Sequence, residues 1–304
     1  MGNSEKWIEL NISDQSGKII CITGSNRGLG LEDAKILAGK GAQVIMACRD
    51  VDKANSAREG IRNEYPDAML DVMELNLADF ASIDEFSAHV LENYVKLDVL
   101  INNAGGVMGA YQKTAQGFEF SFGVNHLGHF RLTALLLPLL LQTPNARIVN
   151  VSSSAHRWGK INFVDLNTEK DYKPMKAYSQ SKLANLLFTY ELQRRLDAAG
   201  KPICVVASHP GWARTHISKA RLTRLISKIF AQSPTMGALP TVYAAVGDAV
   251  TSGKYFGPGG LLGISGFPKE VQSSKMARGI GLAGKLWQIS EERAGVNYKT
   301  ILES

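Results

Sequence analysis

The stretch TGSNRGLG, residues 23–30, stands where an apolar run, KIICIT (18–23), gives way to a helical pattern. Its glycines, Gly24, Gly28 and Gly30, allow a tight turn in which little side-chain bulk covers the backbone. Such a turn brings backbone N–H groups and the N-terminus of the following helix against a pyrophosphate. The strand–turn–helix context therefore predicts a nucleotide-binding turn here.

The same glycine spacing recurs near the C-terminus, in GKYFGPG at residues 253–259. Pro258 lies inside this copy, and no amphipathic helix pattern follows it. Without a helix N-terminus behind the turn, the second copy lacks the group that would bind phosphate. We therefore predict that it forms a loop.

Outward from the first glycine turn, short apolar runs alternate with longer amphipathic ones. The predicted strands are 18–23, 43–48, 68–75, 97–102, 147–152 and 203–208. The predicted helices are roughly 29–40, 51–64, 80–94, 118–142 and 177–199. This alternation predicts an α/β fold with a single doubly wound (Rossmann-type) parallel sheet and helices on both faces. Ligands of such a sheet bind at the carboxyl ends of its strands.

The chain of 304 residues contains no linker-like or low-complexity stretch. We therefore predict a single dinucleotide-binding catalytic domain over 1–304, with a C-terminal extension over about 254–304. The segment SKARLTRLISKIF (218–230) places apolar residues on one helical face and basic residues on another. We predict that about 212–232 forms a lid over the substrate, with a membrane-surface helix or an ordinary surface helix as alternatives.

The charge balance is basic, with 34 Lys and Arg against 28 Asp and Glu and a net charge of +6. Such a surface can bind nucleic acid or an anionic cofactor. The basic residues are scattered and no nucleic-acid-binding motif is present, so we predict no nucleic-acid partner.

The three cysteines, Cys21, Cys48 and Cys204, are odd in number and far apart. This pattern argues against a disulfide framework or a zinc site and suits a reducing compartment. We therefore predict no metal and a cytoplasmic location. The most apolar run, LTALLLPLLL (132–141), is too short to cross a bilayer and contains Pro138, so we also predict no transmembrane segment.

The second predicted strand ends in ACRD (47–50), where a dinucleotide fold meets the adenosine ribose. An arginine there can pair with the 2′-phosphate of NADP, and Arg49 is in place. Arg27 in the glycine turn can supply a second cation. Asp50 keeps binding of the NAD ribose open as an alternative, but two cations around one pocket favour NADP(H).

The next two strands also end in polar residues. Asn76 can bond an adenine edge, or it can simply form a turn. The sequence NNAG (102–105) can form a turn that lets a cofactor lie close to the backbone, although turn chemistry alone would also explain it.

Taken together, six motifs occur in an order that resembles the short-chain dehydrogenase/reductase family over about residues 16–215. These motifs are TGSNRGLG, NNAG, VNHLGHF (124–130), RIVNVSSSAH (147–156), YSQSK (178–182) and HPGWART (209–215). The further stretches ACRD, SKLANLLFTYELQRRL and GKYFGPGG are most similar to the retinol-dehydrogenase and WW-domain-oxidoreductase-like branch.

The resemblance implies four catalytic roles. Tyr178 is the implied acid and base, and Lys182 its activator and ribose ligand. Ser153 is implied to bond the reacting oxygen, with Ser152 as its rival, and Asn125 to hold a proton relay. Asn76 departs from the family, which usually has aspartate there. The residues predicted to contact the cofactor are Gly24, Ser25, Asn26, Arg27, Gly28, Leu29, Gly30, Arg49, Asn76, Leu77, Asn103, Ala104, Gly105, Tyr178, Lys182, Pro210, Gly211 and Thr215.

The pattern Tyr-x-x-x-Lys occurs twice, as Tyr172 with Lys176 and as Tyr178 with Lys182. Pro174 interrupts the first copy, and proline disfavours helix for the residue before it, so this pair should straddle a helix start and point apart. The second copy lies in an unbroken helix, where residues four apart share a face. We therefore predict that Tyr178 is catalytic, with its pKa lowered by the neighbouring ammonium and by the positive nicotinamide ring of the cofactor.

These residues predict an NADP(H)-dependent oxidoreductase that transfers a hydride between the nicotinamide and a carbonyl or alcohol substrate. The alternative is a non-catalytic dinucleotide-binding regulator. Large apolar residues in the least family-like segments indicate an apolar substrate of retinal, steroid or lipid type, or else ordinary core packing: Met108, Trp158, Trp212, Ile226 and Phe230. By resemblance, the helices at about 118–142 and 177–199 pack against a second subunit in a homodimer or homotetramer.

Overall fold

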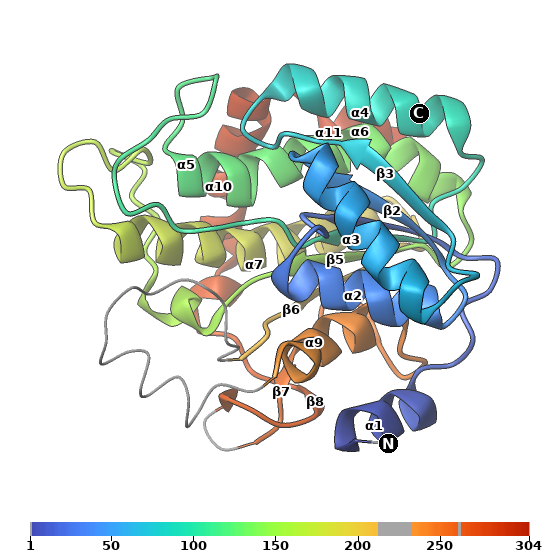
Figure 1. The fold of residues 1–304 in the computed structure, drawn as a ribbon. Helices are drawn as coiled ribbons and strands as arrows, with labels where there is room; N and C mark the ends of the chain where they lie inside the picture. The colour runs from blue at the N-terminus through green and yellow to red at the C-terminus, as the bar shows by residue number, and fades with distance from the viewer. Residues whose placement is uncertain (1, 212–232, 261–262, 304) are drawn as a thin grey trace.

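The computed structural model describes residues 2–211, 233–260 and 263–303. One eight-stranded sheet runs through these residues in the order β3-β2-β1-β4-β5-β6-β7-β8 (Figure 1). Its strands are β1 (Ile19–Thr23), β2 (Gln43–Cys48), β3 (Leu70–Glu74), β4 (Val99–Asn102), β5 (Arg147–Val151), β6 (Cys204–Ser208), β7 (Tyr255–Pro258) and β8 (Pro268–Glu270). The strands pair in parallel from β3 to β7, and only β8 is antiparallel.

The helices connect these strands and begin at residues suited to helix starts. Asp50, Asp79 and Ser233 accept a hydrogen bond from a backbone N–H in the first turn of the helix that each precedes, and Pro174 is the first residue of its helix. The α-helices are α1 (Asn3–Asn11), α2 (Gly28–Gly39), α3 (Val51–Glu64), α4 (Phe80–Asn93), α5 (Phe120–Phe122), α6 (His129–Gln142), α7 (Pro174–Ala198), α9 (Pro234–Val246), α10 (Ile280–Ala294) and α11 (Tyr298–Glu303). The described residues also form a π-helix (Gly123–Gly128) and 3-10 helices (Ser154–Trp158, Met276–Arg278).

The two faces of the sheet carry separate apolar cores. Alternate strand residues such as Cys21 and Leu100 pack with α4, α6 and α7. Their neighbours, such as Ile22 and Ile101, pack with α2, α3 and α9 on the other face. Figure 1 shows α4 and α6 on one side of the strands and α2 and α9 on the other. The predicted doubly wound fold is therefore confirmed.

The segment GKYFGPG is not wholly a loop, and the prediction for it was wrong. Tyr255 and Phe256 are buried and pair with Ala207 and Ser208 of β6. Gly257 is needed because a Cβ there would collide with the ring of His209. Pro258 is tolerated because it is the last residue of the strand. The lid predicted over about 212–232, including Trp212, Thr215, Ile226 and Phe230, lies outside the described residues.

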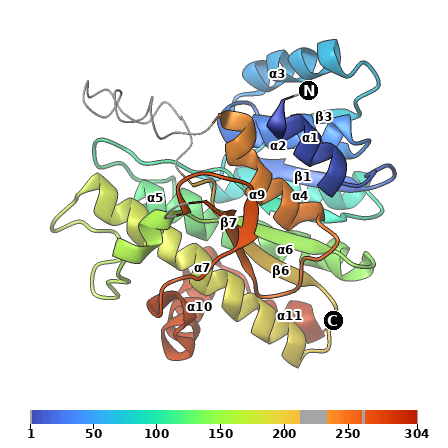
Figure 2. The ribbon, with the colours of Figure 1, turned by 90° about the horizontal axis from the view of Figure 1, so that it is seen from below.

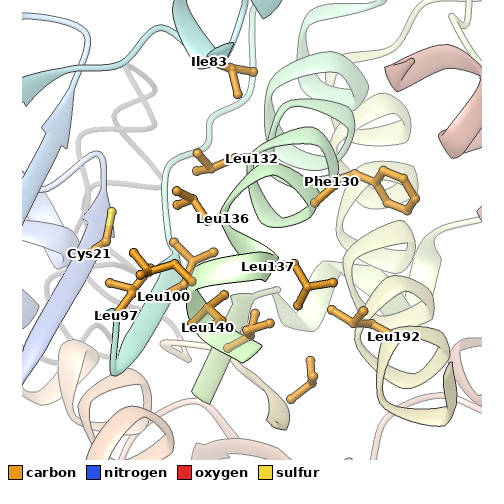
Figure 3. Packing of buried hydrophobic residues seen from close by; sticks show 14 of the residues in the cluster. Cys21, Ile83, Leu97, Leu100, Phe130, Leu132, Leu136, Leu137, Leu140 and Leu192 are labelled. Atoms are coloured by element: carbon orange, nitrogen blue, oxygen red, sulfur yellow. The ribbon is translucent and has the colours of Figure 1, made fainter. Parts of the chain in front are cut away.

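Helix α6 lies in the core. Figure 3 shows Leu132, Leu136 and Leu140 of this helix lying toward the sheet, where Cys21 and Leu100 are labelled. The whole helical run 120–142 is long and apolar enough to cross a membrane by composition, although 132–141 alone was judged too short. Because 78% of its most apolar window is buried inside the protein, its placement is that of a core helix.

The C-terminal helices cover part of α6 and α7. Trp287 packs 5.1 Å from the ring of Phe130, and Tyr298 packs 4.9 Å from the same ring and donates to the Phe130 carbonyl. Figure 2 shows α10 and α11 beside α7, away from α1 and α3. This aromatic part of α6 and α7 is therefore occupied by the chain itself and not open to a second subunit. The oligomeric state remains a prediction.

Candidate active site

The glycine turn between β1 and α2 is open to solvent at Gly28 and tightly packed at Gly30, and we call its open side the glycine cradle. Gly24 and Gly28 have φ values of +69° and +60°, which side chains rarely adopt. A Cβ at Gly30 would collide with the Asn103 side chain, whereas one at Gly28 would meet nothing within 4 Å. Arg27, at the N-cap of α2, makes no side-chain cap, so the first N–H groups of α2 have no capping side chain. This arrangement fits the pyrophosphate of a dinucleotide.

The rest of the glycine turn supports this cradle. The hydroxyl of Ser25 points inward and donates to the Ile22 carbonyl at 3.1 Å, and the side chain is buried. Asn26 and Leu29 are half-buried beside it. Sequence reasoning placed these residues with the cofactor, and the structure places Ser25 under the turn as a support.

Thr23 ties the glycine turn to the NNAG turn. Its Oγ1 accepts from the backbone N–H of Asn103 at 3.0 Å and of Ala104 at 2.8 Å. The Asn103 amide donates to the Thr23 carbonyl at 2.8 Å, and Gly24 packs against Ala104. Asn102 is not a turn residue but the buried end of β4, bonded to Asn150 of β5.

Two arginine side chains lie near the end of β2, where the adenosine ribose of the cofactor is predicted to bind. Arg27 and Arg49 are exposed, and neither guanidinium forms a hydrogen bond or ion pair with a residue of the described part of the chain. Asp50, by contrast, accepts from the Lys53 backbone N–H and side chain, which lowers the pKa of its carboxyl. Because Asp50 is the N-cap of α3, its carboxylate has a structural role that Arg49 does not have.

Asn76 and Leu77 follow β3. The Asn76 side-chain oxygen accepts from the Ala78 backbone N–H at 3.2 Å, which is the turn geometry weighed as its alternative role. Its amide nitrogen bonds no described residue and can still donate to an adenine. Leu77 is buried under Gly128, where a Cβ would meet its carbonyl oxygen.

The predicted catalytic residues meet at the ends of β4 and β5 and the start of α7. The Lys182 ammonium lies 5.8 Å from the Tyr178 ring centroid and donates to the Val151 carbonyl at 2.9 Å. Asn125 donates to Ser181 at 2.9 Å. A Cβ at Gly105 would lie 2.9 Å from the Asn125 side-chain oxygen and 3.4 Å from the Lys182 nitrogen, so only glycine leaves the space between them open.

Two adjacent serines are distinguished by what they contact. Ser152 is buried and donates to the Lys182 carbonyl at 2.8 Å, so its hydroxyl holds α7 in place. Ser153 is half-buried; its hydroxyl accepts from the Ala155 N–H and lies close enough to the Tyr178 phenol to lower the pKa of that phenol. The structure therefore brings Ser153, not Ser152, to the tyrosine.

The pKa values of Tyr178 and Lys182 differ from the expectation that the lysine lowers the pKa of the tyrosine. Burial raises the pKa of Tyr178, and the bond with Ser153 opposes this rise without cancelling it. Burial also lowers the pKa of Lys182 to about 8, and the side chain is only 4% exposed. In this structure the pKa of the phenol therefore lies above its ordinary value, because burial is the largest influence on it.

Asn125 lies in the π-helix that precedes α6. The side-chain amide nitrogen of Asn125 donates to the Ser181 hydroxyl and to the Gly106 carbonyl. The backbone carbonyl oxygen of Asn125 lies 3.1 Å from His129 Nδ1. His129 Nε2 lies 2.9 Å from Thr23 Oγ1, which links this residue to the glycine turn. A π-helix is rare and often marks a functional site. Neither it nor the buried His129 bridge gave a signal in the sequence reading.

Gly159 also went unnoticed in the sequence. It ends the 3-10 helix after Ser153, and a Cβ there would collide with the Ser179 carbonyl on α7. The turn carrying Ser153 therefore approaches Tyr178 only because residue 159 has no side chain. The reason for glycine at this position is its close contact with the backbone of α7, and no sequence pattern indicates that contact.

Of the remaining predicted residues, the structure describes Pro210, Gly211, Trp158 and Met108. Gly211 has φ +68° and packs against Ile264 and Pro258, next to Pro210. Thr215 lies outside the described residues. Trp158, predicted to line the substrate pocket, is 75% exposed at the end of the 3-10 helix, and Met108 is half-buried. Within 2–211, 233–260 and 263–303, no group of His, Cys, Asp or Glu side chains could hold a metal.

Comparison with known proteins gives a consistent result. Residues 18–225 match the family described as short chain dehydrogenase. The chain is 43% identical over 290 residues to retinol dehydrogenase 12 of Mus musculus, covering 93% of this chain and 88% of that protein. It is 42% identical over 303 residues to retinol dehydrogenase 14 of Homo sapiens, covering 92% and 87%.

Solved structures share the fold. An uncharacterised protein from Mycobacterium paratuberculosis is 41% identical with a TM-score of 0.81, and the match covers 95% of this chain and 97% of that one. A short chain dehydrogenase from Shigella flexneri, solved with NADP, is 24% identical with a TM-score of 0.64 over 80% and 97%.

Proposed function

From the premise that this chain belongs to the short-chain dehydrogenase family, we propose that it transfers a hydride between NADP(H) and an apolar carbonyl or alcohol compound. The family makes the chain an oxidoreductase that acts on alcohol and carbonyl groups. The choice of NADP and of an apolar substrate is our proposal.

The meeting of Ser153, Tyr178, Lys182 and Asn125 at the strand ends, beside the glycine cradle, carries the proposal. A bound nicotinamide supplies or accepts the hydride. The protein supplies the proton and orients the reacting oxygen. Ser153 offers a hydroxyl that bonds Tyr178 and can donate to a substrate oxygen, and Tyr178 donates the proton in reduction or accepts it in oxidation.

Lys182 keeps this proton transfer workable at neutral pH. With a pKa of about 8, its buried side chain is mostly an ammonium at pH 7, which favours phenolate once Tyr178 has given up its proton. Asn125 and Gly105 border the same space, so a proton can be replaced through the polar groups around Lys182 and need not cross the apolar core.

Arg27 and Arg49 support NADP over NAD. Both are exposed and unpaired within the described residues, near the end of β2 where the ribose binds. Asp50, the residue that would favour NAD, is engaged as the cap of α3. A guanidinium can bind a phosphate bidentately, which gives Arg49 a direct role with the 2′-phosphate.

The substrate class rests on the names of relatives and on the site's surroundings. The proteins about 40% identical over most of the chain are named retinol dehydrogenases. Trp158 offers a large apolar surface close to Ser153 in sequence. We therefore propose a retinal-like, steroid-like or lipid-like aldehyde or ketone. The free thiols of Cys21, Cys48 and Cys204 suit the reducing cytoplasm that we also propose.

The test is NADPH oxidation across a panel of retinals, ketosteroids, quinones, aliphatic aldehydes and β-keto esters. We expect turnover with an apolar carbonyl compound and a preference for NADPH over NADH. Binding of NADPH without turnover of any compound would instead indicate a regulatory protein.

A further inference from the structure

One buried imidazole joins the turn that carries Ser153 to the C-terminal part of the chain. His156 lies in the 3-10 helix immediately after Ser153 and is 1% exposed. Its Nδ1 lies 2.6 Å from the Ser153 carbonyl oxygen, and its Nε2 lies 3.1 Å from the Ser274 backbone nitrogen. A backbone N–H can only donate, so Nε2 accepts and Nδ1 carries the proton.

Neighbouring contacts hold the same C-terminal segment without reaching the serine. Arg157 donates to the Gln272 carbonyl at 2.6 Å, and the Tyr190 hydroxyl bonds the Ser273 hydroxyl at 2.9 Å. Tyr190 belongs to α7 and makes no contact with Ser153 among the described residues. Arg157 thus also ties the 3-10 helix to this segment, but within the described part of the chain it is the His156 side chain that bonds both Ser153 itself and the 272–274 segment.

This bridge joins the serine turn to a part of the chain beyond the family model. The model matches residues 18–225, whereas Ser274 lies after it. The retinol dehydrogenases match 92–93% of the chain, so the segment around Ser274 lies within the part that is shared with those relatives.

We propose that His156 is a positioning residue, whose neutral imidazole fixes Ser153 against Tyr178 by tying the serine turn to the backbone of Ser274. The proposal rests on the proposed function, in which Ser153 and Tyr178 act on the substrate oxygen. The Ser153 carbonyl accepts from both the backbone and the imidazole of His156, so the orientation of the serine is fixed by two bonds. Loss of the imidazole would leave one of them.

The surroundings of His156 keep it neutral. Tyr255 packs edge-on against the ring at 5.6 Å, and burial lowers the pKa of the imidazole. The charged or titratable groups that face it are Arg157 and His209. The Arg157 guanidinium opposes a second proton on the ring, and burial lowers the pKa of His209 to about 4, so that this neighbour is itself neutral. A protonated ring would place an N–H against the Ser274 N–H and break the bridge.

Three substitutions and one control test the proposal. His156→Phe keeps a ring beside Tyr255 and removes both nitrogens. His156→Asn keeps a donor near the Ser153 carbonyl but cannot reach Ser274, and it serves if the first variant does not fold. His156→Gln can place its amide oxygen near the Ser274 N–H. Tyr190→Phe is the matched control, because it loosens the same segment without touching Ser153.

Two readouts separate positioning from general stability. The first is kcat and KM for NADPH with a carbonyl substrate. The second is the ionisation of Tyr178, followed by NMR of labelled tyrosine rings and assigned with Tyr178→Phe, which needs no turnover. We expect His156→Phe and His156→Asn to lower kcat about tenfold with little change in KM for NADPH. The Tyr178 pKa should rise as the Ser153 bond weakens, as it should in Ser153→Ala, and His156→Gln should recover part of both effects.

The Tyr190→Phe control distinguishes positioning of Ser153 from general loosening of the 272–274 segment. We expect Tyr190→Phe to keep kcat and the Tyr178 ionisation of the wild type. The proposal is overturned if Tyr190→Phe matches His156→Phe, or if the His156 variants leave the Tyr178 ionisation unchanged while Ser153→Ala moves it. If Ser153→Ala does not move it and the wild type reduces no carbonyl compound, the proposed function fails first and the positioning role fails with it.

Discussion

Two copies of one pattern, six residues apart, lie in very different surroundings in this chain. Tyr172 lies outside α7 and donates to the Met108 carbonyl at 2.7 Å, while Lys176 is exposed on the first turn beside Asp171. Tyr178 and Lys182 lie further along α7, where the lysine is buried and placed over the tyrosine ring.

The difference between the two copies lies in their partners and their burial. The first pair is separated by the helix start at Pro174, and each member bonds a different surface group. In the second pair, Lys182 has no carboxylate partner among the described residues and bonds a backbone carbonyl. Identical spacing therefore gives a pair at the surface in one case and, in the other, a pair with a buried lysine beside the strand ends, because only the second has partners there.

The largest expected effect separates the two tyrosines directly. Tyr178→Phe should lower kcat/KM by about 10²–10⁴-fold, because a positioned general acid contributes about that much. NADPH affinity should stay close to that of the wild type. Tyr172→Phe loses only a bond to Met108 and should stay within about twofold. Steady-state kinetics checks both, and equal losses would contradict the distinction drawn between the copies.

The two lysines should differ in stability as well as in activity. Below about pH 8 Lys182 is charged in both the folded and the unfolded chain, and its burial penalty is fully present. Between about pH 8 and 10.5 the folded chain has released the proton and the unfolded chain has not, so its contribution to stability rises with pH.

Lys182→Met should therefore abolish most activity yet raise the free energy of unfolding at pH 7, on the order of 2 kcal/mol. This gain should fade as the pH approaches 10.5, the ordinary pKa of lysine. Lys176→Met, at an exposed position, should change neither quantity. Thermal unfolding across this pH range gives the measurement, and a gain that does not depend on pH would refute the assignment of the penalty to the buried charge.

Arg49 and Asp50 are a second pair of residues with similar positions in the sequence and different surroundings, and only Arg49 is expected to determine the preference for NADPH. Arg49→Ala should raise KM for NADPH about tenfold to a hundredfold, since a lost charge-assisted pair is worth roughly 1.5–3 kcal/mol. KM for NADH should change little. Asp50→Ala should instead destabilise α3 by about 1 kcal/mol through loss of its cap and leave the cofactor preference intact. A wild type that prefers NADH would reverse these roles.

The smallest effect concerns a buried group without partners. Asp33 in α2 is fully buried, and neither carboxylate oxygen bonds a described residue. Burial raises its pKa well above 3.8, so the unfolded chain ionises first and stability falls as the pH rises above 3.8. Asp33→Ala should stabilise the protein by about 1 kcal/mol at neutral pH and less toward pH 3.8. Calorimetry is the check, with Glu32→Gln as the control, because Glu32 already bonds Thr235.

The sequence was sufficient where local pattern determines structure. The predicted strand over 43–48 and helix over 51–64 have the observed bounds, because apolar runs and a capping aspartate are local signals. Pro174 is likewise a local signal, and it distinguishes the two tyrosines from the sequence alone. The order of the motifs along the chain located the strand ends at which the site is built.

The sequence was insufficient where a residue depends on a distant partner. β7 exists because Tyr255 pairs with Ala207 and because Gly257 leaves room for His209. The closeness of Ser153 to Tyr178 depends on Gly159, and the raised pKa of Tyr178 depends on burial by the whole fold. These contacts join segments far apart along the chain, and no local pattern encodes them.

The most direct test of the account is transfer of an isotopic label to the product. NADPH carrying deuterium at the transferring position of its nicotinamide ring is incubated with an apolar aldehyde such as retinal, and the alcohol is examined by mass spectrometry. The account predicts singly deuterated alcohol from the wild type and from Tyr172→Phe, and almost none from Tyr178→Phe in the same time. Labelled alcohol from Tyr178→Phe at the rate of Tyr172→Phe would contradict it.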